Sequence, residues 1–200
     1  RAWEEDTAVP FKPQRVLSDL HKVLDDRDIV VSDVGAHKVW VARMFPASVP
    51  NTCLISNGFA SMGIALPGAV AAKLTHPERR VVAIAGDGGA MMNIQELETA
   101  VRLGTALVLV VFVDGLYGLI EWKQQNRYGH STSVDFGNPD WVRLAESMGA
   151  EGARIQGSDE LMPGLQWAVG RNGPVVLEVP IDARENLKLT QHLGEIVCPI

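Results

Sequence analysis

Two aspartates occupy equivalent positions in the sequence, each where a strongly apolar run ends. Asp87 comes one glycine after Val81–Ala85, and Asp114 directly follows Ala106–Val113. Two unit charges about 4 Å apart repel each other by about 4 kcal/mol at an effective dielectric of about 20, and a divalent cation between them reverses the sign. Proteins commonly hold Mg²⁺ with one or two carboxylates and share it with the phosphates of a ligand. The pair therefore predicts a magnesium site.

Glycines surround the first of these aspartates. Gly86, Gly88 and Gly89 lie on either side of Asp87, and a turn without side chains leaves its backbone N–H groups open to a phosphate. A tight turn or a helix cap is the plain alternative for either aspartate alone. Because one strand–helix–strand passage separates Asp87 from Asp114, the pair together favours a joint site for magnesium and a diphosphate.

The elements that position these residues follow from the hydrophobic pattern. Four short runs are almost wholly apolar and rich in β-branched residues, which is typical of parallel strands covered on both faces. Helical patterns separate them, so we predict an α/β fold with a doubly wound, mostly parallel sheet and helices on both faces. The predicted strands are 28–32, 81–85, 106–113 and 174–180, and the predicted helices are 15–24, 65–74, 93–103 (capped by Asn93), 140–148 (capped at Asn138-Pro139) and one ending at 166–169.

Ligands of such sheets bind beyond the carboxyl ends of the strands. The loops that follow the first three predicted strands are Asp33–His37, Gly86–Ala90 and Asp114–Gly118, and all three are rich in glycine and carboxylate. Because parallel strands end at the same edge, we expect these loops to form one site.

Composition limits the class of protein. With 200 residues, 46% hydrophobic and 21% charged, the chain predicts a single domain over 1–200, with a linker or terminal segment at 1–14 and a C-terminal tail at 181–200. A net charge of −6 without a basic cluster argues against nucleic acid, and no apolar run is long enough to span a membrane. Cys53 and Cys198 lack zinc or disulfide spacing, which fits a reducing cytoplasm.

Four segments in order carry a resemblance to a known family. Gly86-Asp87-Gly88, with an acid at the next strand end, resembles the thiamine-diphosphate (ThDP) motif, and Gly86–Leu97 is close to the GDGSFMMNVQEL of acetolactate synthases. Asp33–His37 resembles their DVGQH segment, and Asn57–Pro67 resembles their GGLGTMGFGLP. The chain is thus similar to the C-terminal diphosphate-binding domain of a ThDP- and Mg²⁺-dependent enzyme of the acetolactate synthase type.

The resemblance implies a role for each matching position. Met62 is the apolar wedge that bends the cofactor so that its 4′-nitrogen approaches C2, and the carbonyl of Ala60 accepts from the same amino group. Asp87, Asp114 and the backbone carbonyl of Leu116 are the implied metal ligands. The implied cofactor-binding residues are Gly35, Ala36, His37, Ala60, Met62, Gly86, Gly88, Gly89, Ala90, Tyr117 and Gly118.

Three positions depart from the family pattern. Val113-Asp114 replaces the closing Asn pair of the motif, which resembles catabolic, FAD-independent acetolactate synthases. Trp122 follows Gly118 one residue sooner than in anabolic enzymes, and Ala36 stands where the family has Gln.

The resemblance also implies partners. The family's catalytic Glu belongs to a pyrimidine-binding domain, usually of a partner subunit, and no segment here resembles that domain. We expect a homodimer or homotetramer whose intact chain is about two to three times longer, and a domain that is inactive alone. The implied reaction decarboxylates pyruvate and transfers the two-carbon unit to a second 2-oxo acid. An enzyme acting on an aryl-2-oxo acid, oxalyl-CoA or glyoxylate, and a non-catalytic ThDP- or nucleotide-binding module, remain alternatives.

Overall fold

The computed structural model describes residues 6–190 and contains a six-stranded, all-parallel sheet. The strand order is β2-β1-β3-β4-β6-β5, so the predicted α/β fold with a parallel sheet is confirmed. The two strands that the sequence did not predict, β2 and β5, are short, incompletely buried and lie at the sheet edges. The strands are β1 (Ile29–Ser32), β2 (Cys53–Ile55), β3 (Val81–Gly86), β4 (Val108–Val113), β5 (Glu151–Arg154) and β6 (Val175–Pro180).

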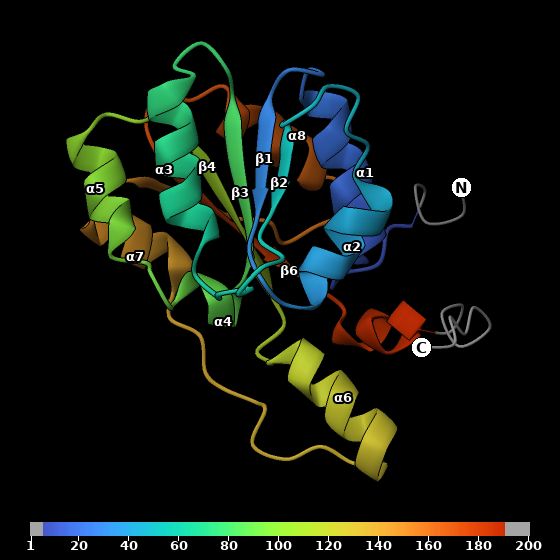
Figure 1. Cartoon of the computed structure of the whole chain (residues 1–200). Helices are drawn as coiled ribbons and strands as arrows, with labels where there is room; N and C mark the ends of the chain where they lie inside the picture. Colours follow the sequence, from blue (N-terminus) through green and yellow to red (C-terminus); the bar gives the residue numbers. More distant parts are fainter. Residues whose placement is uncertain (1–5, 191–200) are drawn as a thin grey trace.

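Helices cover both faces of the sheet, as a doubly wound fold requires (Figure 1). One face packs against α1 (Pro13–Val23), α2 (Ala36–Met44) and α8 (Leu161–Val169). The other face packs against α3 (Ala65–Thr75), α5 (Glu96–Arg102) and α7 (Trp141–Ser147). The remaining elements lie toward the carboxyl ends of the strands and are α4 (Asp87–Ala90), α6 (Gly118–Tyr128) and the 3-10 helix η1 (Ala183–Thr190).

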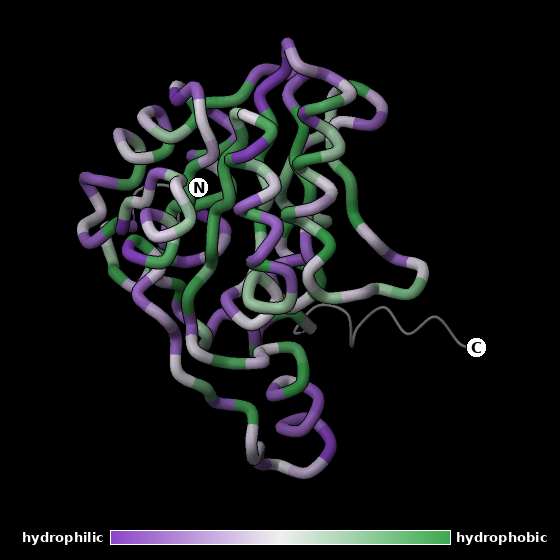
Figure 2. Tube along the Cα trace, turned by 90° about the vertical axis from the view of Figure 1, so that its left-hand side faces the viewer, coloured by the Kyte–Doolittle hydropathy of each residue, from purple (hydrophilic) through white to green (hydrophobic). Residues whose placement is uncertain are grey.

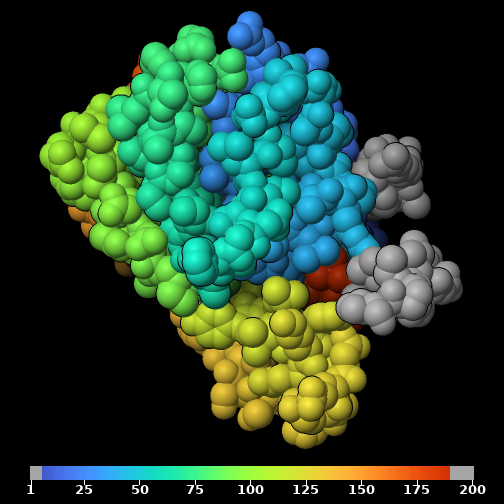
Figure 3. Space-filling model, viewed as in Figure 1, coloured from blue at the N-terminus to red at the C-terminus, as the bar shows by residue number. Residues whose placement is uncertain are grey.

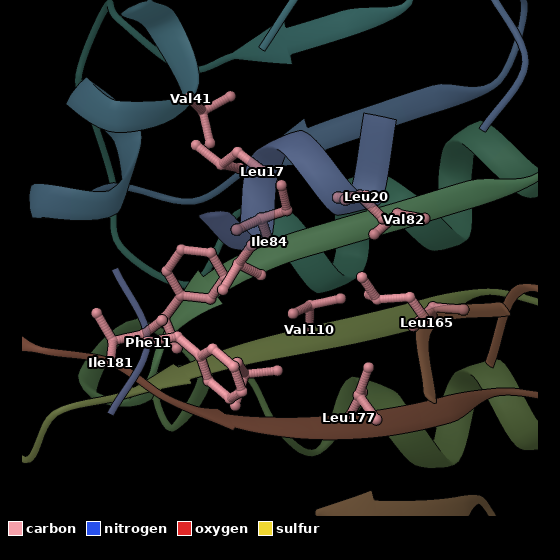
Figure 4. Close-up of a cluster of buried hydrophobic side chains, with 14 of the residues drawn as sticks. Phe11, Leu17, Leu20, Val41, Val82, Ile84, Val110, Leu165, Leu177 and Ile181 are labelled. Carbon is pink, nitrogen blue, oxygen red and sulfur yellow. The ribbon is translucent and has the colours of Figure 1, made fainter. Parts of the chain in front are cut away.

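Side chains that point alternately to the two faces of the sheet explain why the strands are continuously apolar. Val108, Val110 and Phe112 of β4 belong to the first core cluster, and Leu109 and Val111 belong to the second. Successive side chains of a strand point to opposite faces, so a strand covered on both faces is apolar throughout. Figure 2 shows the strands as mainly green segments, whereas the outer turns of α6 are largely purple. Side chains of the first cluster are drawn in Figure 4, among them Leu17, Leu20, Val41, Val82, Ile84, Val110, Leu165 and Leu177.

Two predicted helix caps were wrong, because the amide oxygens that would cap the helices accept from side chains instead, Asn93 Oδ1 from Gln95 and Asn138 Oδ1 from Trp141. Helix α5 begins at Glu96 after Gln95, and the Asn93 amide instead donates to the carbonyl of Gly63 at 3.0 Å. Helix α7 is capped by Asp140, whose side chain accepts from the backbone N–H of Arg143.

The strand order turns at the boundary between β1 and β3, where the chain passes first to one side of β1 and later to the other. In doubly wound sheets the carboxyl end of this boundary is the usual place for a ligand. Helix α6, drawn in yellow, projects from that end of the molecule in the space-filling view (Figure 3). The topology thus places the reversal of strand order next to the three loops that the sequence singled out.

Both ends of the described chain pack onto the body. The buried Phe11 forms a parallel bridge with Ile181, with hydrogen bonds from Phe11 N to Pro180 O and from Asp182 N to Phe11 O. Residues 1–5 of the predicted terminal segment and 191–200 of the predicted tail lie outside the described residues. Within 6–190, no helix has both the length and the apolar character that a membrane crossing needs.

A substitution at Leu165 tests whether the first hydrophobic core cluster is packed as described. We expect Leu165→Ala to lower the free energy of unfolding by about 2–5 kcal/mol, because this fully buried side chain would leave a cavity against the sheet. Leu74→Ala, at a position that is 55% exposed on α3, should change it by less than about 0.5 kcal/mol. Urea denaturation measures both, and equal effects would contradict the assignment of the core.

Candidate functional site

A cavity of about 190 Å³ lies at the carboxyl ends of β1, β3 and β4. It brings together thirteen of the residues that the sequence proposed for a site. Ala90 does not line it, because its side chain packs into the second core cluster. The predicted residues that line the cavity are Gly35, Ala36, His37, Ala60, Met62, Gly86, Asp87, Gly88, Gly89, Asp114, Leu116, Tyr117 and Gly118.

The two aspartates meet as the spacing predicted. Gly86 of β3 pairs with Phe112 of β4, so both strands end at one edge. Oδ2 of the buried Asp87 accepts from the backbone N–H groups of Asp114 at 3.2 Å and of Gly115 at 2.8 Å. Its Oδ1 accepts from the N–H of Gly88 at 2.8 Å. These donors stabilise the Asp87 carboxylate and tie it to the next loop.

Asp114 has fewer donors. Its Oδ1 accepts from the backbone N–H of Leu116 at 3.1 Å, and its Oδ2 accepts from the Asn186 amide at 3.4 Å. Burial, and then the negative charge of Asp87, raise the pKa of Asp114 to about 7. An ionised carboxylate in this environment is unfavourable unless a positive charge lies beside it.

The oxygen donors fit a shared divalent cation. Each oxygen of a carboxylate has about two lone-pair positions. Among the described residues, Asp87 Oδ2 accepts from Asp114, Gly115 and Asn138, whereas its Oδ1 accepts from Gly88 and keeps a position open. Each oxygen of Asp114 accepts one hydrogen bond and also keeps a position open. Within residues 6–190, no group of three His, Cys, Asp or Glu side chains converges on one point. A cation at this edge therefore needs further ligands from the backbone, from water or from a bound molecule, and phosphate oxygens are suited to that part.

The N-terminus of α2 offers hydrogen-bond donors to an anionic group such as a phosphate. Gly35 precedes the helix without a side-chain cap, so the N–H groups of the first turn are available to a ligand. His37 in this turn is 7% exposed, and its Nε2 has no hydrogen-bond partner. A Cβ at Gly35 would lie 2.9 Å from the His37 ring, so a larger residue there would displace the ring. A buried nitrogen without a partner beside a cavity is suited to a bound acceptor.

Burial also sets the charge of that imidazole. It lowers the pKa of His37 to about 4, and a hydrogen bond to the backbone of Asp33 acts in the opposite direction. The ring is therefore neutral at pH 7 without a ligand and carries a single N–H. Nε2 donates to an anion when that proton lies on Nε2 instead of serving the Asp33 backbone, or when the anion keeps the ring protonated.

The loop that carries Ala60 and Met62 is clamped on both sides of Gly63. The buried carboxylate of Asp33 accepts from the N–H of Gly63 at 2.9 Å and from that of Ala65 at 3.3 Å. The Asn93 amide donates to the Gly63 carbonyl at 3.0 Å. Gly63 has φ +87°, and a Cβ there would lie 2.8 Å from the Asn93 amide nitrogen. The clamp fixes Met62 at the wall of the cavity.

Some residues of the site were missed by sequence reasoning. Asn186 of η1 lines the cavity and contacts Asp114, although the sequence analysis assigned its segment only to the C-terminal tail. Asn138, predicted as a helix cap, donates to Oδ2 of Asp87 at 2.7 Å. Trp40 also lines the cavity. No local pattern marks these residues, since each acts on a partner distant in the sequence.

Comparison with known proteins decides the family. Residues 33–179 match the family model "Thiamine pyrophosphate enzyme, C-terminal TPP binding domain". The chain belongs to this family of thiamine pyrophosphate enzymes. Thiamine diphosphate, the same compound as thiamine pyrophosphate, is thus the cofactor of this domain family, as the sequence predicted. The contacts predicted for single residues of this thiamine pyrophosphate domain stay predictions.

Acetolactate synthases are among the relatives of this thiamine pyrophosphate domain. It is 38% identical to acetolactate synthase of Bacillus subtilis, covering 98% of this chain and 35% of that protein. It is 35% identical to the catabolic acetolactate synthase of Raoultella terrigena, with 92% and 34% covered. It is also 35% identical to the mitochondrial acetolactate synthase catalytic subunit of Saccharomyces cerevisiae, with 90% and 27% covered. The chain spans about a third of the length of these relatives.

His37 gives the domain a pH dependence that can be measured without cofactor. Its folded pKa of about 4 lies below the unfolded value of about 6.5, so the unfolded chain binds the proton first and stability falls as the pH falls. From pH 7.5 to 5, we expect the free energy of unfolding to fall by about 2 kcal/mol more in the wild type than in His37→Gln.

Urea denaturation at a series of pH values measures this difference. Above pH 7.5 the profiles of the wild type and His37→Gln should run parallel, because the imidazole is neutral in both states of the wild type there. Parallel profiles down to pH 5 would contradict a buried neutral imidazole.

Proposed function

We propose that this chain supplies the diphosphate and Mg²⁺ site of an acetolactate synthase-type enzyme. The enzyme would decarboxylate pyruvate and transfer the resulting two-carbon unit to a second 2-oxo acid. The observation that carries the proposal is the meeting of Asp87 and Asp114 in one cavity with the unpaired Nε2 of His37 and the uncapped start of α2. The similarity to acetolactate synthases supports this reaction over others.

The residues of the cavity divide the binding between them. Asp87, Asp114 and the carbonyl of Leu116 would hold Mg²⁺, which neutralises the two carboxylates and the diphosphate together. His37 and the first-turn N–H groups of α2 would donate to the diphosphate oxygens. Met62, held by the clamp on Gly63, would set the bend of the bound cofactor.

The chemistry itself belongs to the cofactor. Bound ThDP supplies a nucleophilic carbon for attack on the keto group of a 2-oxo acid and an electron sink for the carbanion left by loss of CO₂. The chain contributes position and electrostatics. Apolar residues that line the cavity, including Phe112, Leu116 and Ile181, exclude water and so strengthen the attraction between the cation and its oxygen ligands.

A second domain is part of the proposal. A carboxylate that hydrogen-bonds the aminopyrimidine ring would come from the pyrimidine-binding domain of a partner subunit, in a homodimer or homotetramer. The coverage of about a third of each relative supports a longer enzyme. An enzyme for aryl-2-oxo acids, oxalyl-CoA or glyoxylate would use the same diphosphate site, and its substrate contacts would come mostly from the other domains.

The metal site is tested on the full-length enzyme by the binding of ThDP with and without Mg²⁺. We expect Asp87→Ala to lose Mg²⁺-dependent binding by about 100-fold or more, because a metal ligand and the acceptor for three backbone donors disappear together. Asp114→Asn should retain binding within about tenfold, since its amide still offers an oxygen ligand.

Titration calorimetry measures the affinity, and thermal melting without cofactor checks that each variant folds. Wild-type ThDP affinity in a folded Asp87→Ala, or equal wild-type affinity with and without Mg²⁺, would show that the metal site is wrong.

Measurements of pyruvate turnover test whether this chain needs a second domain for activity. The 200-residue chain, given ThDP, Mg²⁺ and pyruvate, should release no CO₂ above the background, whereas the full-length enzyme should form 2-acetolactate. Rapid consumption of pyruvate by the chain alone would contradict the proposed dependence on a second domain. Turnover by the full-length enzyme of an aryl-2-oxo acid, oxalyl-CoA or glyoxylate, but not of pyruvate, would replace the reaction proposed here.

A further inference from the structure

Each of the two carboxylates is contacted by an asparagine that is itself contacted by a tryptophan. Trp40 Nε1 donates to Asn186 Oδ1 at 3.0 Å, and Asn186 Nδ2 donates to Asp114 Oδ2 at 3.4 Å. At the other carboxylate, Trp141 Nε1 donates to Asn138 Oδ1 at 3.2 Å, and Asn138 Nδ2 donates to Asp87 Oδ2 at 2.7 Å. We call the first chain of contacts the Asn186 relay and the second the Asn138 relay.

The tryptophans decide which way the amides point. An indole N–H is a donor only, so the asparagine atom that faces it must be the oxygen. The NH₂ group of the same amide then faces the carboxylate, where it can donate. The chemistry of the two partners thus fixes an orientation that the shape of the amide alone leaves open.

The Asn186 relay is the more deeply buried of the two. Asn186 is 3% exposed and Trp40 is 6% exposed, whereas Asn138 lies in an exposed part of the chain. Asn186 comes from η1, Trp40 from α2 and Asp114 from the end of β4, so the relay joins three elements. Burial of an amide without hydrogen-bond partners is unfavourable, and Asn186 has a partner for its oxygen and a partner for its NH₂ group.

The two carboxylates also depend on their asparagines to different degrees. Asp87 Oδ2 has two backbone donors besides Asn138. Among the described residues, the hydrogen bonds to the Asp114 side chain come from the Leu116 N–H on Oδ1 and from Asn186 on Oδ2. Removal of Asn186 therefore frees one oxygen of Asp114, whereas removal of Asn138 leaves Asp87 still held.

We propose that Asn186, oriented by Trp40, is a positioning residue for the metal-ligating carboxylate of Asp114. It fixes the rotation of that carboxylate before the cation arrives, so that less order is lost on binding. The η1 segment is then part of the cofactor site, although it follows the last strand of the sheet. This inference rests on the proposed Mg²⁺ site at Asp87 and Asp114.

The η1 segment has anchors that do not involve Asn186. The Gln14 amide donates to Glu185 at 3.0 Å, Arg43 donates to the carbonyl of Leu189 at 2.6 Å, and Leu189 is buried in the first core cluster. These contacts make it possible to separate the positioning of Asp114 from the mere attachment of the segment.

The test measures metal binding by the full-length enzyme with saturating ThDP. Mn²⁺ serves as the probe, its free fraction is read by electron paramagnetic resonance, and Mg²⁺ is titrated against it. Asn186→Leu keeps the size of the side chain but removes both hydrogen bonds, and we expect it to weaken metal binding about tenfold or more. Trp40→Phe should weaken binding in the same direction by a smaller factor, and Asn138→Leu should also have a smaller effect.

Gln14→Ala is the matched control, because it removes an anchor of η1 without touching Asp114, and it should bind metal as the wild type does. If Gln14→Ala weakens binding as much as Asn186→Leu, attachment of the segment accounts for the effect and the positioning role is wrong. Wild-type binding by Asn186→Leu, with binding lost in Asp87→Ala, would also overturn the inference while leaving the proposed metal site intact. Wild-type binding by Asp87→Ala would instead refute the proposed site itself.

Discussion

Two negative charges share one buried edge of the sheet, and much of the site is arranged around them. Asp87 and Asp114 directly follow adjacent strands, and backbone N–H groups of the second loop donate to the first carboxylate. Even so, burial and Asp87 raise the pKa of Asp114 to about 7. A structure that keeps such a pair favours a cation, since only a positive charge turns the repulsion between the carboxylates into attraction.

Three aspartates occupy the same kind of position in the fold but have different roles. Asp33, Asp87 and Asp114 each directly follow a strand, β1, β3 and β4 respectively. Asp87 and Asp114 line the cavity, whereas Asp33 turns its carboxylate to the backbone of the loop around Gly63. The partner in space, rather than the place at the strand end, decides whether the carboxylate faces a ligand or holds a loop.

The topology explains why so many segments converge. The strand order reverses between the paired strands β1 and β3, the loops after these strands and after β4 reach one cavity, and α2 begins there. The η1 segment and the turn before α7 then approach the two carboxylates from outside the sheet. Helix α6 projects from this end of the molecule, with Gly118 as its buried residue.

The sequence alone determined the parallel sheet, the edge shared by Asp87 and Asp114, and the family, because local composition carries that information. A strand buried on both faces must be apolar at every position, and equal strand–helix–strand spacing brings strand ends together. Only the tertiary structure decided the short edge strands β2 and β5 and the partners of Asn93, Asn138 and Asn186. An asparagine side chain can cap a helix or bond to a distant group with similar energy. The choice therefore depends on which partner the folded chain brings within reach.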